Sequence, residues 1–189
     1  MTELRNVGFS YGGRPILTNF NLRVPDGSCV CLSGPSGCGK TTVLKLVLGL
    51  LTPEAGEIIS PERPSVVFQE DRLLNGFSLK KNILLPLPKE HHNYALQLLQ
   101  EAGLGDELSK KVGNLSGGMK RRAAIVRAVA FGGDMLILDE PFNGIDPDNK
   151  AKMADMIKRE FLSKGKSVLM VSHIEADAEL LNAEKQFVN

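Results

Sequence analysis

The sequence lacks several features that mark nucleic-acid-binding and membrane-spanning proteins. It has no tryptophan and only two tyrosines among 189 residues, so few aromatic rings are available to stack on bases. Its formal net charge is +1, so it has no strong overall positive field. The longest apolar run, TTVLKLVLGLL, contains Lys45 and is too short to cross a bilayer. We therefore expect no nucleic-acid partner and no transmembrane helix.

Two further absences concern the cellular compartment. The start, MTELRNVGFS, does not have the charged and then apolar pattern of a secretory signal. The three cysteines are an odd number without metal-ligand spacing, which argues against a disulfide framework. Cys29 and Cys31 alternate along an apolar segment and so share one face of an expected strand, which favours buried thiols over metal ligands. These features predict a soluble cytosolic protein.

What is present is an alternation of strands and helices. Strands are expected at TELRNV, LTNFNLRV, SCVCLS, GEIIS, PSVVFQ, MLILD, SVLMVS and KQFV. Helices are expected from Lys40 to about Leu51, after Gly118, and from Pro147 to about Ser163. A leucine-rich helical section over residues 70–111 interrupts this order. The pattern predicts an α/β fold with a largely parallel sheet and a small helical insert.

The clearest motif is GPSGCGKT, Gly34 to Thr41, which fits G-x-x-x-x-G-K-[ST] between an apolar strand and a helix. Its glycines allow successive backbone N–H groups to point at phosphate oxygens, and the helix dipole favours the same anion. Lys40 is expected to reach the β- and γ-phosphates, Thr41 to bind Mg²⁺, and Thr42 to lie near the α-phosphate. The alternative, a glycine-rich turn with an incidental lysine, is disfavoured by the full spacing. The expected phosphate-binding residues are Gly34, Pro35, Ser36, Gly37, Cys38, Gly39, Lys40, Thr41 and Thr42.

A second motif, DMLILDEP, supplies acidic residues at the end of an apolar strand. Asp139 suits Mg²⁺, directly or through water, and Glu140 suits polarising a water for attack on the γ-phosphorus. A strand that ends in two acids is common by chance. The motif therefore indicates a Mg²⁺ and water site only in combination with the phosphate-binding loop.

The segment NLSGGMKRRAAIVRAVA, Asn114 to Ala130, is an unusual helix start. Lys120, Arg121 and Arg122 oppose the helix dipole, which favours anions at this end. Ser116–Gly118 could form a simple serine cap or a second anion site. Because the first loop already accounts for one nucleotide, a second anion site suggests a nucleotide bound to another copy of the chain. Phosphate or neighbouring acids could then offset the three cations.

With LSGGM about twenty residues before MLILDE and behind the phosphate-binding loop, the chain resembles the ATP-binding-cassette (ABC) ATPase family over essentially its whole length. The resemblance implies one domain, residues 1–189. A RecA-like P-loop NTPase core with an N-terminal antiparallel β subdomain would take in 1–69 and 119–189, and a helical subdomain 70–118. It also implies a head-to-tail homodimer in which two ATPs lie between one subunit's phosphate-binding loop and the other's Ser116–Gly118.

The resemblance also implies roles for individual residues. Tyr11 resembles the aromatic residue that stacks on adenine, and Gln69 the glutamine that contacts Mg²⁺ and water and senses the transport subunit. Glu140 resembles the catalytic glutamate, Asp146 an aspartate at the dimer seam, and His173 the histidine that contacts the γ-phosphate. The expected catalytic residues are Lys40, Glu140 and His173; the expected Mg²⁺ ligands are Thr41, Gln69 and Asp139; the remaining nucleotide contacts are Tyr11, Ser116, Gly117 and Gly118.

The chain also departs from the family pattern. Met119 stands where glutamine is common, NGID is an unusual variant, and the chain is shorter than most relatives. We expect no C-terminal regulatory domain and no coiled-coil insertion. His91 and His92 match nothing in the pattern and are expected to be solvated.

These features predict an ATPase subunit of a membrane transporter, with import favoured. Expected partners are a second copy and integral membrane permease subunits, with a substrate-binding protein reached indirectly. The protein would then lie at the inner face of the cell membrane. Leu73, Leu74 and Phe77 either receive a permease helix or pack inside the insert. VVFQEDRLL most resembles the nitrate, sulfonate and taurine importer branch.

Two other functions remain open. One is a soluble ABC ATPase that acts on nucleic acid or ribosomes, against which the near-zero net charge and the single cassette argue. The other is a non-hydrolysing clamp, against which Glu140 and His173 argue.

Overall fold

The computed structural model describes residues 1–188 and is built around a five-stranded parallel sheet. The strand order is β5 (Ser65–Val67), β6 (Met135–Asp139), β7 (Ser167–Val171), β3 (Cys29–Ser33) and β8 (Glu184–Phe187). Every residue of β6 and β7 is buried, as expected for apolar strands in a parallel sheet covered on both faces. The predicted α/β P-loop fold is confirmed.

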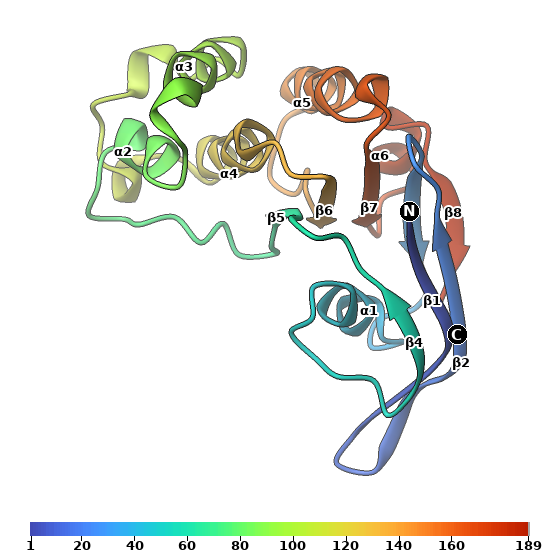
Figure 1. Cartoon of the computed structure of the whole chain (residues 1–189). Coiled ribbons are helices and arrows are strands. Elements are labelled where there is room, and N and C mark those ends of the chain that lie inside the picture. Colours follow the sequence, from blue (N-terminus) through green and yellow to red (C-terminus); the bar gives the residue numbers. More distant parts are fainter. Residues whose placement is uncertain (189) are drawn as a thin grey trace.

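Helices and a second sheet cover the two faces of the parallel sheet (Figure 1). One face carries α4 (Gly117–Phe131), α5 (Pro147–Glu160) and α6 (Glu175–Leu180), and the other carries α1 (Lys40–Val47). The alternation along β3 divides the core accordingly, because Cys29 and Cys31 pack on the α4 and α5 side while Val30 and Leu32 pack on the α1 side. Both thiols are buried as predicted, and burial raises the pKa of Cys29 to about 12.

The second sheet is antiparallel and has the order β2 (Arg14–Val24), β1 (Thr2–Tyr11) and β4 (Ala55–Ile59). The turn between β1 and β2 uses Gly12 and Gly13, both with positive φ, which suits the twist of a tight hairpin. The sheet packs its apolar face against α1, so the antiparallel part and the start of the phosphate-binding helix share one core.

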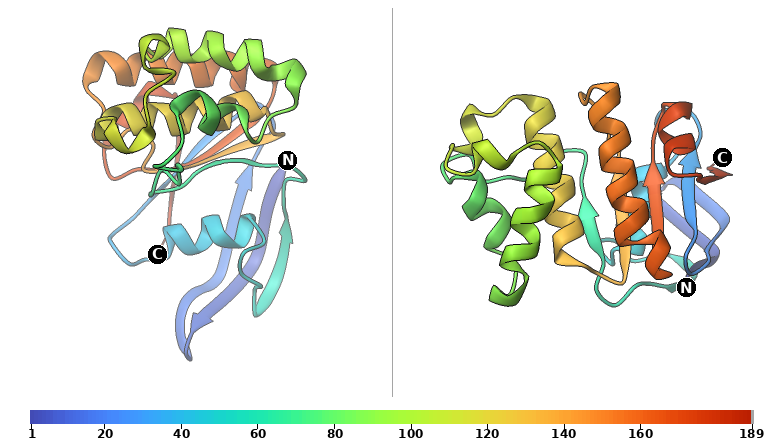
Figure 2. Two further views of the ribbon diagram at one scale, coloured as in Figure 1. Left: turned by 90° about the vertical axis from the view of Figure 1, so that its left-hand side faces the viewer. Right: turned by 90° about the horizontal axis from the view of Figure 1, so that it is seen from above.

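The predicted helical insert is present between β5 and α4. It contains α2 (Leu79–Leu84), α3 (His92–Glu101) and short 3₁₀ turns at Lys89–His91, Gly105–Glu107 and Val112–Asn114; a fourth 3₁₀ turn, Leu162–Lys164, follows α5. Figure 2 shows the insert beside α4, and its buried leucines belong to the same core cluster as the apolar residues of α4. The insert therefore rests on the helix that begins at the LSGGM motif.

Several details differ from the sequence prediction. The first helix ends at Val47 rather than near Leu51, because Gly49 takes a φ of 65° and the chain turns away. The helix from Pro147 ends at Glu160 rather than near Ser163. The expectation that His91 and His92 are solvated was wrong: both are half-buried, and the His92 Nε2 atom lies 3.2 Å from the Leu87 carbonyl oxygen.

The apolar residues after Gln69 are not all packed inside the insert. Leu73 packs against the core of the insert, whereas Leu74 is 46% exposed and Phe77 is 40% exposed. Within residues 1–188, no helix has the length and hydropathy needed to cross a membrane.

Candidate active site

The phosphate-binding loop joins β3 to α1 and depends on glycine at specific positions. Gly34, Gly37 and Gly39 have φ values of 144°, 82° and 107°, which other residues rarely adopt. A Cβ on Gly34 would lie 2.6 Å from the Val188 carbonyl oxygen, and one on Gly39 would lie 2.9 Å from the Ile16 Cγ2 atom. Backbone conformation and close packing therefore both require glycine in this loop.

Lys40, the first residue of α1, folds its side chain back over this loop. Its ammonium donates hydrogen bonds to the carbonyl oxygens of Gly34 at 2.8 Å and Pro35 at 2.9 Å, with the Cys38 sulfur 3.7 Å away. The residue is 6% exposed. The buried Lys40 ammonium thus lies directly against the backbone of the phosphate-binding loop.

A cavity of about 460 Å³ opens next to this loop and unites residues from distant parts of the chain. Among the residues predicted from the sequence, its lining contains Tyr11, Ser36, Gly37, Gly39, Lys40, Thr41, Thr42, Gln69, Asp139, Glu140 and His173. Sequence reasoning missed Ile16, Asn143 and Val171, which complete the lining. No motif marks these three, because their position depends on how the strands end around the loop. Gly34, Pro35, Cys38 and Ser116–Gly118 do not line this cavity.

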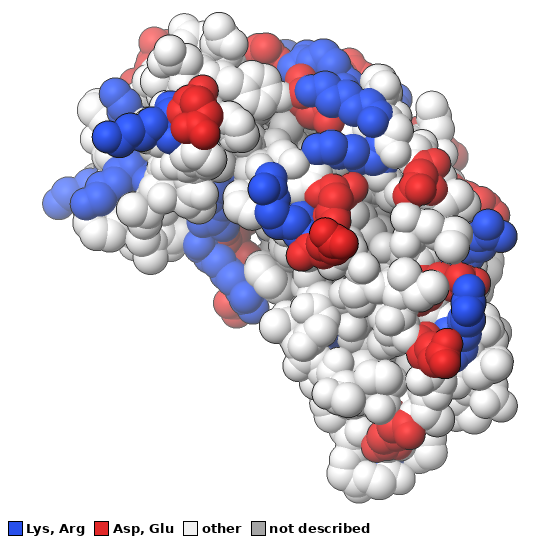
Figure 3. All heavy atoms as spheres, viewed as in Figure 1, with Lys and Arg blue, Asp and Glu red and all other residues white. Residues whose placement is uncertain are grey.

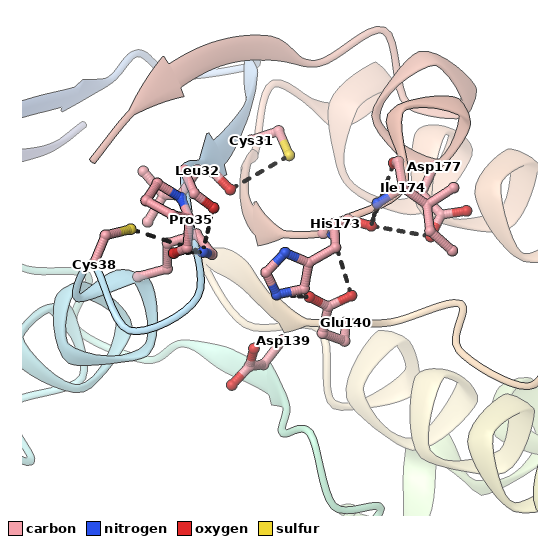
Figure 4. Close-up of polar contacts among 12 residues, drawn as sticks. Cys31, Leu32, Pro35, Cys38, Asp139, Glu140, His173, Ile174 and Asp177 are labelled. Carbon is pink, nitrogen blue, oxygen red and sulfur yellow. Dashed lines mark hydrogen bonds and ion pairs between the residues drawn. The ribbon is translucent and has the colours of Figure 1, made fainter. Parts of the chain in front are cut away.

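Glu140 lies where β6 meets the cavity and has an unusual backbone. Its φ is 51°, a left-handed conformation that costs energy for a residue other than glycine. Its N–H donates to the Val171 carbonyl oxygen at 2.9 Å, which ties the residue to the end of the neighbouring strand β7. The turn aims the carboxylate at His173, as Figure 4 shows.

The two oxygens of the Glu140 carboxylate are not equivalent. Oε2 accepts a hydrogen bond from the His173 backbone N–H at 3.4 Å. Oε1 lies 3.3 Å from the His173 Nε2 atom, yet this contact lacks hydrogen-bond geometry, so Oε1 is buried without a donor among the described residues. Burial raises the pKa of the Glu140 carboxyl, and His173 partly opposes that effect. A buried acceptor with a free lone pair beside the cavity can hold a water molecule.

Asp139 and Thr41 bring oxygen atoms to the same cavity. Burial raises the pKa of the Asp139 carboxyl, while the charges of Arg121, Lys45, His173 and Lys40 lower it. No group of three or more His, Cys, Asp or Glu side chains is placed to hold a metal within residues 1–188. The oxygen ligands that are present are one carboxylate, one hydroxyl and the Gln69 amide. They fit Mg²⁺, which takes few protein ligands and completes its coordination shell with phosphate and water.

Ser116 is the N-cap of the 15-residue helix α4, and Gly117 and Gly118 are its first two residues. The Ser116 side chain caps the helix by accepting a hydrogen bond from the Met119 N–H at 3.3 Å. Ser116 and Gly117 are exposed, and a Cβ added to Gly117 would meet nothing within 4 Å. A Cβ added to Gly118 would instead lie 2.8 Å from the Gly144 carbonyl oxygen. The serine cap is therefore present, and of the two glycines Gly117 is open to solvent.

The three cations after this motif have different hydrogen-bond partners. Arg121 is 4% exposed and points into the protein, where it donates to backbone carbonyls at the ends of β5 and β6. Arg122 donates to the Ala102 carbonyl oxygen and to Asn149. Lys120 donates to the Gly113 carbonyl oxygen at 3.5 Å. Backbone carbonyls thus accept hydrogen bonds from all three cations, which the sequence pattern did not indicate.

Comparisons with known proteins agree with this arrangement. The model of the family described as ABC transporter matches residues 17–143. The chain is 38% identical over 187 residues to "Aliphatic sulfonates import ATP-binding protein SsuB 3" of Paraburkholderia xenovorans, covering 98% of this chain and 75% of the relative. It is 36% identical over 197 residues to "Nod factor export ATP-binding protein I" of Burkholderia lata, covering 95% and 64%.

Two solved structures are similar over the whole chain. "Structure of ATP binding subunit of ABC transporter" has a TM-score of 0.91 at 25% identity and is covered to 86%. "Dimeric structure of a post-hydrolysis state of the ATP-binding cassette MJ0796 bound to ADP and Pi" has a TM-score of 0.87 at 26% identity and is covered to 94%. This chain belongs to the ABC transporter family, in which it is an ATP-binding and ATP-hydrolysing subunit.

Proposed function

We propose that the cavity beside the phosphate-binding loop binds ATP and Mg²⁺ and is the site of hydrolysis. The phosphates would lie against the backbone of residues 34–42, where N–H groups, the α1 dipole and the Lys40 ammonium favour negative charge. The base would lie against Tyr11, whose ring is 45% exposed and is held edge-on by Phe9 with centroids 4.9 Å apart. Thr41, Gln69 and Asp139 would hold Mg²⁺, which neutralises phosphate charge when bound.

Glu140 would act on the attacking water. Its Oε1 atom accepts a hydrogen bond from water and takes the proton as the water oxygen bonds to the γ-phosphorus. The bond from the γ-phosphorus to the β–γ bridging oxygen breaks, giving ADP and phosphate. A pKa raised by burial makes this carboxylate a better base than an exposed one. His173 and Lys40 would stabilise charge on the γ-phosphate. The observation that carries the proposal is the buried Oε1 atom without a donor at the edge of the cavity.

A second copy would complete each site. Ser116 and Gly117 are exposed and Gly118 is half-buried, and all three lie outside their own chain's cavity. They begin a long helix with free N–H groups, so they can bind the γ-phosphate held by a partner. The dimeric structure of the ATP-binding cassette MJ0796 supports this arrangement. Asp146 remains a proposed seam residue; within its own chain its carboxylate caps α5 through Asn149, which lowers the pKa of Asp146.

The dimer would drive import through permease subunits at the inner face of the cell membrane. Exposed Leu74 and Phe77, close in sequence to Gln69, offer an apolar surface for a permease helix, and a substrate-binding protein would act through the permease. Similarity to sulfonate import proteins favours an importer with a small anionic solute, and similarity to a Nod factor export protein makes export the alternative. On the face shown in Figure 3, basic and acidic side chains are interspersed, which gives nucleic acid no continuous basic track there.

The direct test measures steady-state ATPase activity of the wild type, Glu140→Gln and the control Glu62→Gln, in which an exposed glutamate outside the cavity is changed. We expect Glu140→Gln to lower kcat at least about 100-fold, because a general base is lost while the fold is kept. Glu62→Gln should match the wild type. If Glu140→Gln hydrolysed ATP at the wild-type rate, the proposed role of this carboxylate would be wrong.

A further inference from the structure

Arg121 is a buried arginine that the proposed mechanism does not use. It is the fifth residue of α4, one turn after Ser116–Gly118, and is 4% exposed. Its guanidinium lies at the carboxyl ends of β5 and β6, the neighbouring strands that lead to Gln69 and Glu140. A buried cation needs strong partners, so its contacts indicate what it holds in place.

On the side of β6, the guanidinium binds three consecutive carbonyl oxygens. Its Nη2 atom donates to the carbonyls of Asp139 and, at 2.7 Å, Glu140. Its Nε atom donates to the carbonyl of Pro141 at 3.0 Å. The middle carbonyl belongs to the residue with the left-handed φ of 51°. These bonds therefore fix the strained backbone that aims the Glu140 carboxylate.

On the side of β5, the same guanidinium binds the loop that carries Gln69. Its Nη1 atom donates to the carbonyls of Phe68 and, at 3.3 Å, Gln69, and to the Asp71 carboxylate at 3.2 Å. A second arginine of the same helix, Arg127, donates to the Asp71 carbonyl at 3.0 Å. Both arginines thus bind the loop to α4, and of the two it is Arg121 that also donates to the Glu140 carbonyl oxygen.

Arginine suits this position better than lysine. Its planar group presents five N–H donors in a fixed geometry, which matches acceptors that come from two loops. An ammonium is a compact charge with three donors and can satisfy only part of this set. The carbonyls left without a donor in a buried place would then cost stability.

We propose that Arg121 is a positioning residue that holds Gln69 and Glu140 in fixed relation to each other and passes movements of the α4 N-terminus to both. The inference rests on the proposed roles of those two residues in ATP hydrolysis. When a partner's nucleotide binds Ser116–Gly118, any displacement of α4 reaches the Glu140 backbone and the Gln69 loop through one side chain. Correct placement of the attacking water then depends on the position of α4.

The test compares Arg121→Met and Arg121→Lys with the control Arg63→Met, which removes an exposed arginine that lies over the Phe131 ring at the far end of α4. Folding is checked by thermal unfolding, ATP affinity by fluorescence titration, and kcat and KM by steady-state kinetics. For Arg121→Met we expect kcat to fall about 100-fold, as for a misplaced catalytic group, with ATP affinity within about threefold of the wild type. Arg121→Lys should recover only part of kcat, and Arg63→Met should match the wild type.

Three results would overturn the inference. They are unchanged kcat in a folded Arg121→Met, a loss of ATP affinity as large as the loss of kcat, and full recovery by Arg121→Lys. Should Arg121→Met fail to fold, Asp71→Ala tests the same contact. It removes one hydrogen-bond partner of the guanidinium, the Asp71 carboxylate, and the Asp71 side chain is 26% exposed. It should lower kcat several-fold without changing ATP affinity, and unchanged kcat would overturn the inference. The proposed function fails separately, if Glu140→Gln keeps its activity.

Discussion

Two glycine-rich helix starts in this protein look alike in sequence but differ in their surroundings. The start of α1 is packed: Gly34 and Gly39 have positive φ and close neighbours, and Lys40 is buried against the loop. The start of α4 is more open: Ser116 and Gly117 are exposed and Gly117 has no neighbour within 4 Å of an added Cβ, although one on Gly118 would lie 2.8 Å from the Gly144 carbonyl oxygen. Both have backbone N–H groups at a helix start, which suits an anion, but only the first lines the cavity of about 460 Å³. This difference is why we propose that the second start is one half of a site completed by another copy of the chain.

The largest difference between the two helix starts is expected when one methyl group is added to each. Gly39→Ala places a Cβ 2.9 Å from Ile16 at a φ of 107°, so we expect a loss of about 1–3 kcal/mol in the free energy of unfolding. ATP affinity of the monomer should fall by about tenfold or more, because the phosphate-binding backbone is displaced. The measurements are urea unfolding and ATP titration in dilute protein that light scattering shows to be monomeric.

Gly117→Ala is the matched variant in the open helix start. Its free energy of unfolding should stay within about 1 kcal/mol of the wild type, since alanine is tolerated in a helix. Its monomer should bind ATP as tightly as the wild type. If Gly117→Ala weakened ATP binding by the monomer as much as Gly39→Ala, the two regions would not differ as described.

A smaller effect is expected on the pH dependence of kcat, which depends on the packed region around the cavity. Because burial raises the pKa of Glu140, the acid limb of the kcat profile should lie above the ordinary glutamate value of 4.5. His173 lowers this pKa, so His173→Ala should move the limb to higher pH in addition to lowering kcat. A limb at or below 4.5, or a shift to lower pH in His173→Ala, would contradict the electrostatics of the site.

The raised pKa values of the buried carboxyls also make the free energy of unfolding depend on pH. The pKa values of Asp139 and Glu140 are raised on folding, so their protonated forms stabilise the fold below the unfolded pKa values. That contribution is lost as the pH rises through the folded values. Glu140→Gln removes the Glu140 part of this dependence, which urea unfolding at several pH values measures.

Much of the packed region could be predicted from the sequence, because its motifs are contiguous. The spacing of GPSGCGKT and the strand before Asp139 are local signals, and the parallel sheet brings their ends together. Asn143 could not be predicted in the same way, because its place in the cavity depends on the turn after Glu140. The end of α1 was predicted too late, since apolar spacing continued past Gly49 while its positive φ ended the helix.

Arg121 shows the limit of local reasoning most clearly. In sequence it is one of three cations at a helix start, and the helix dipole suggested a bound anion or nearby acids. In the structure its partners lie 18 to 53 residues away, and most are backbone carbonyls that no side-chain pattern reveals. Burial of a charge by distant carbonyls is a tertiary property, so it required the folded chain.

The most direct test of the shared site measures the mass of Glu140→Gln with and without ATP and Mg²⁺ by size-exclusion chromatography with light scattering. We predict a dimer of about 41 kDa with ATP, twice the chain mass of 20.5 kDa, and a monomer without it. Adding Ser116→Arg to this variant should leave it monomeric although each chain still binds ATP, because the large side chain blocks the partner's nucleotide. A Glu140→Gln protein that stays monomeric with ATP bound, or a double variant that dimerises equally well, would contradict the account.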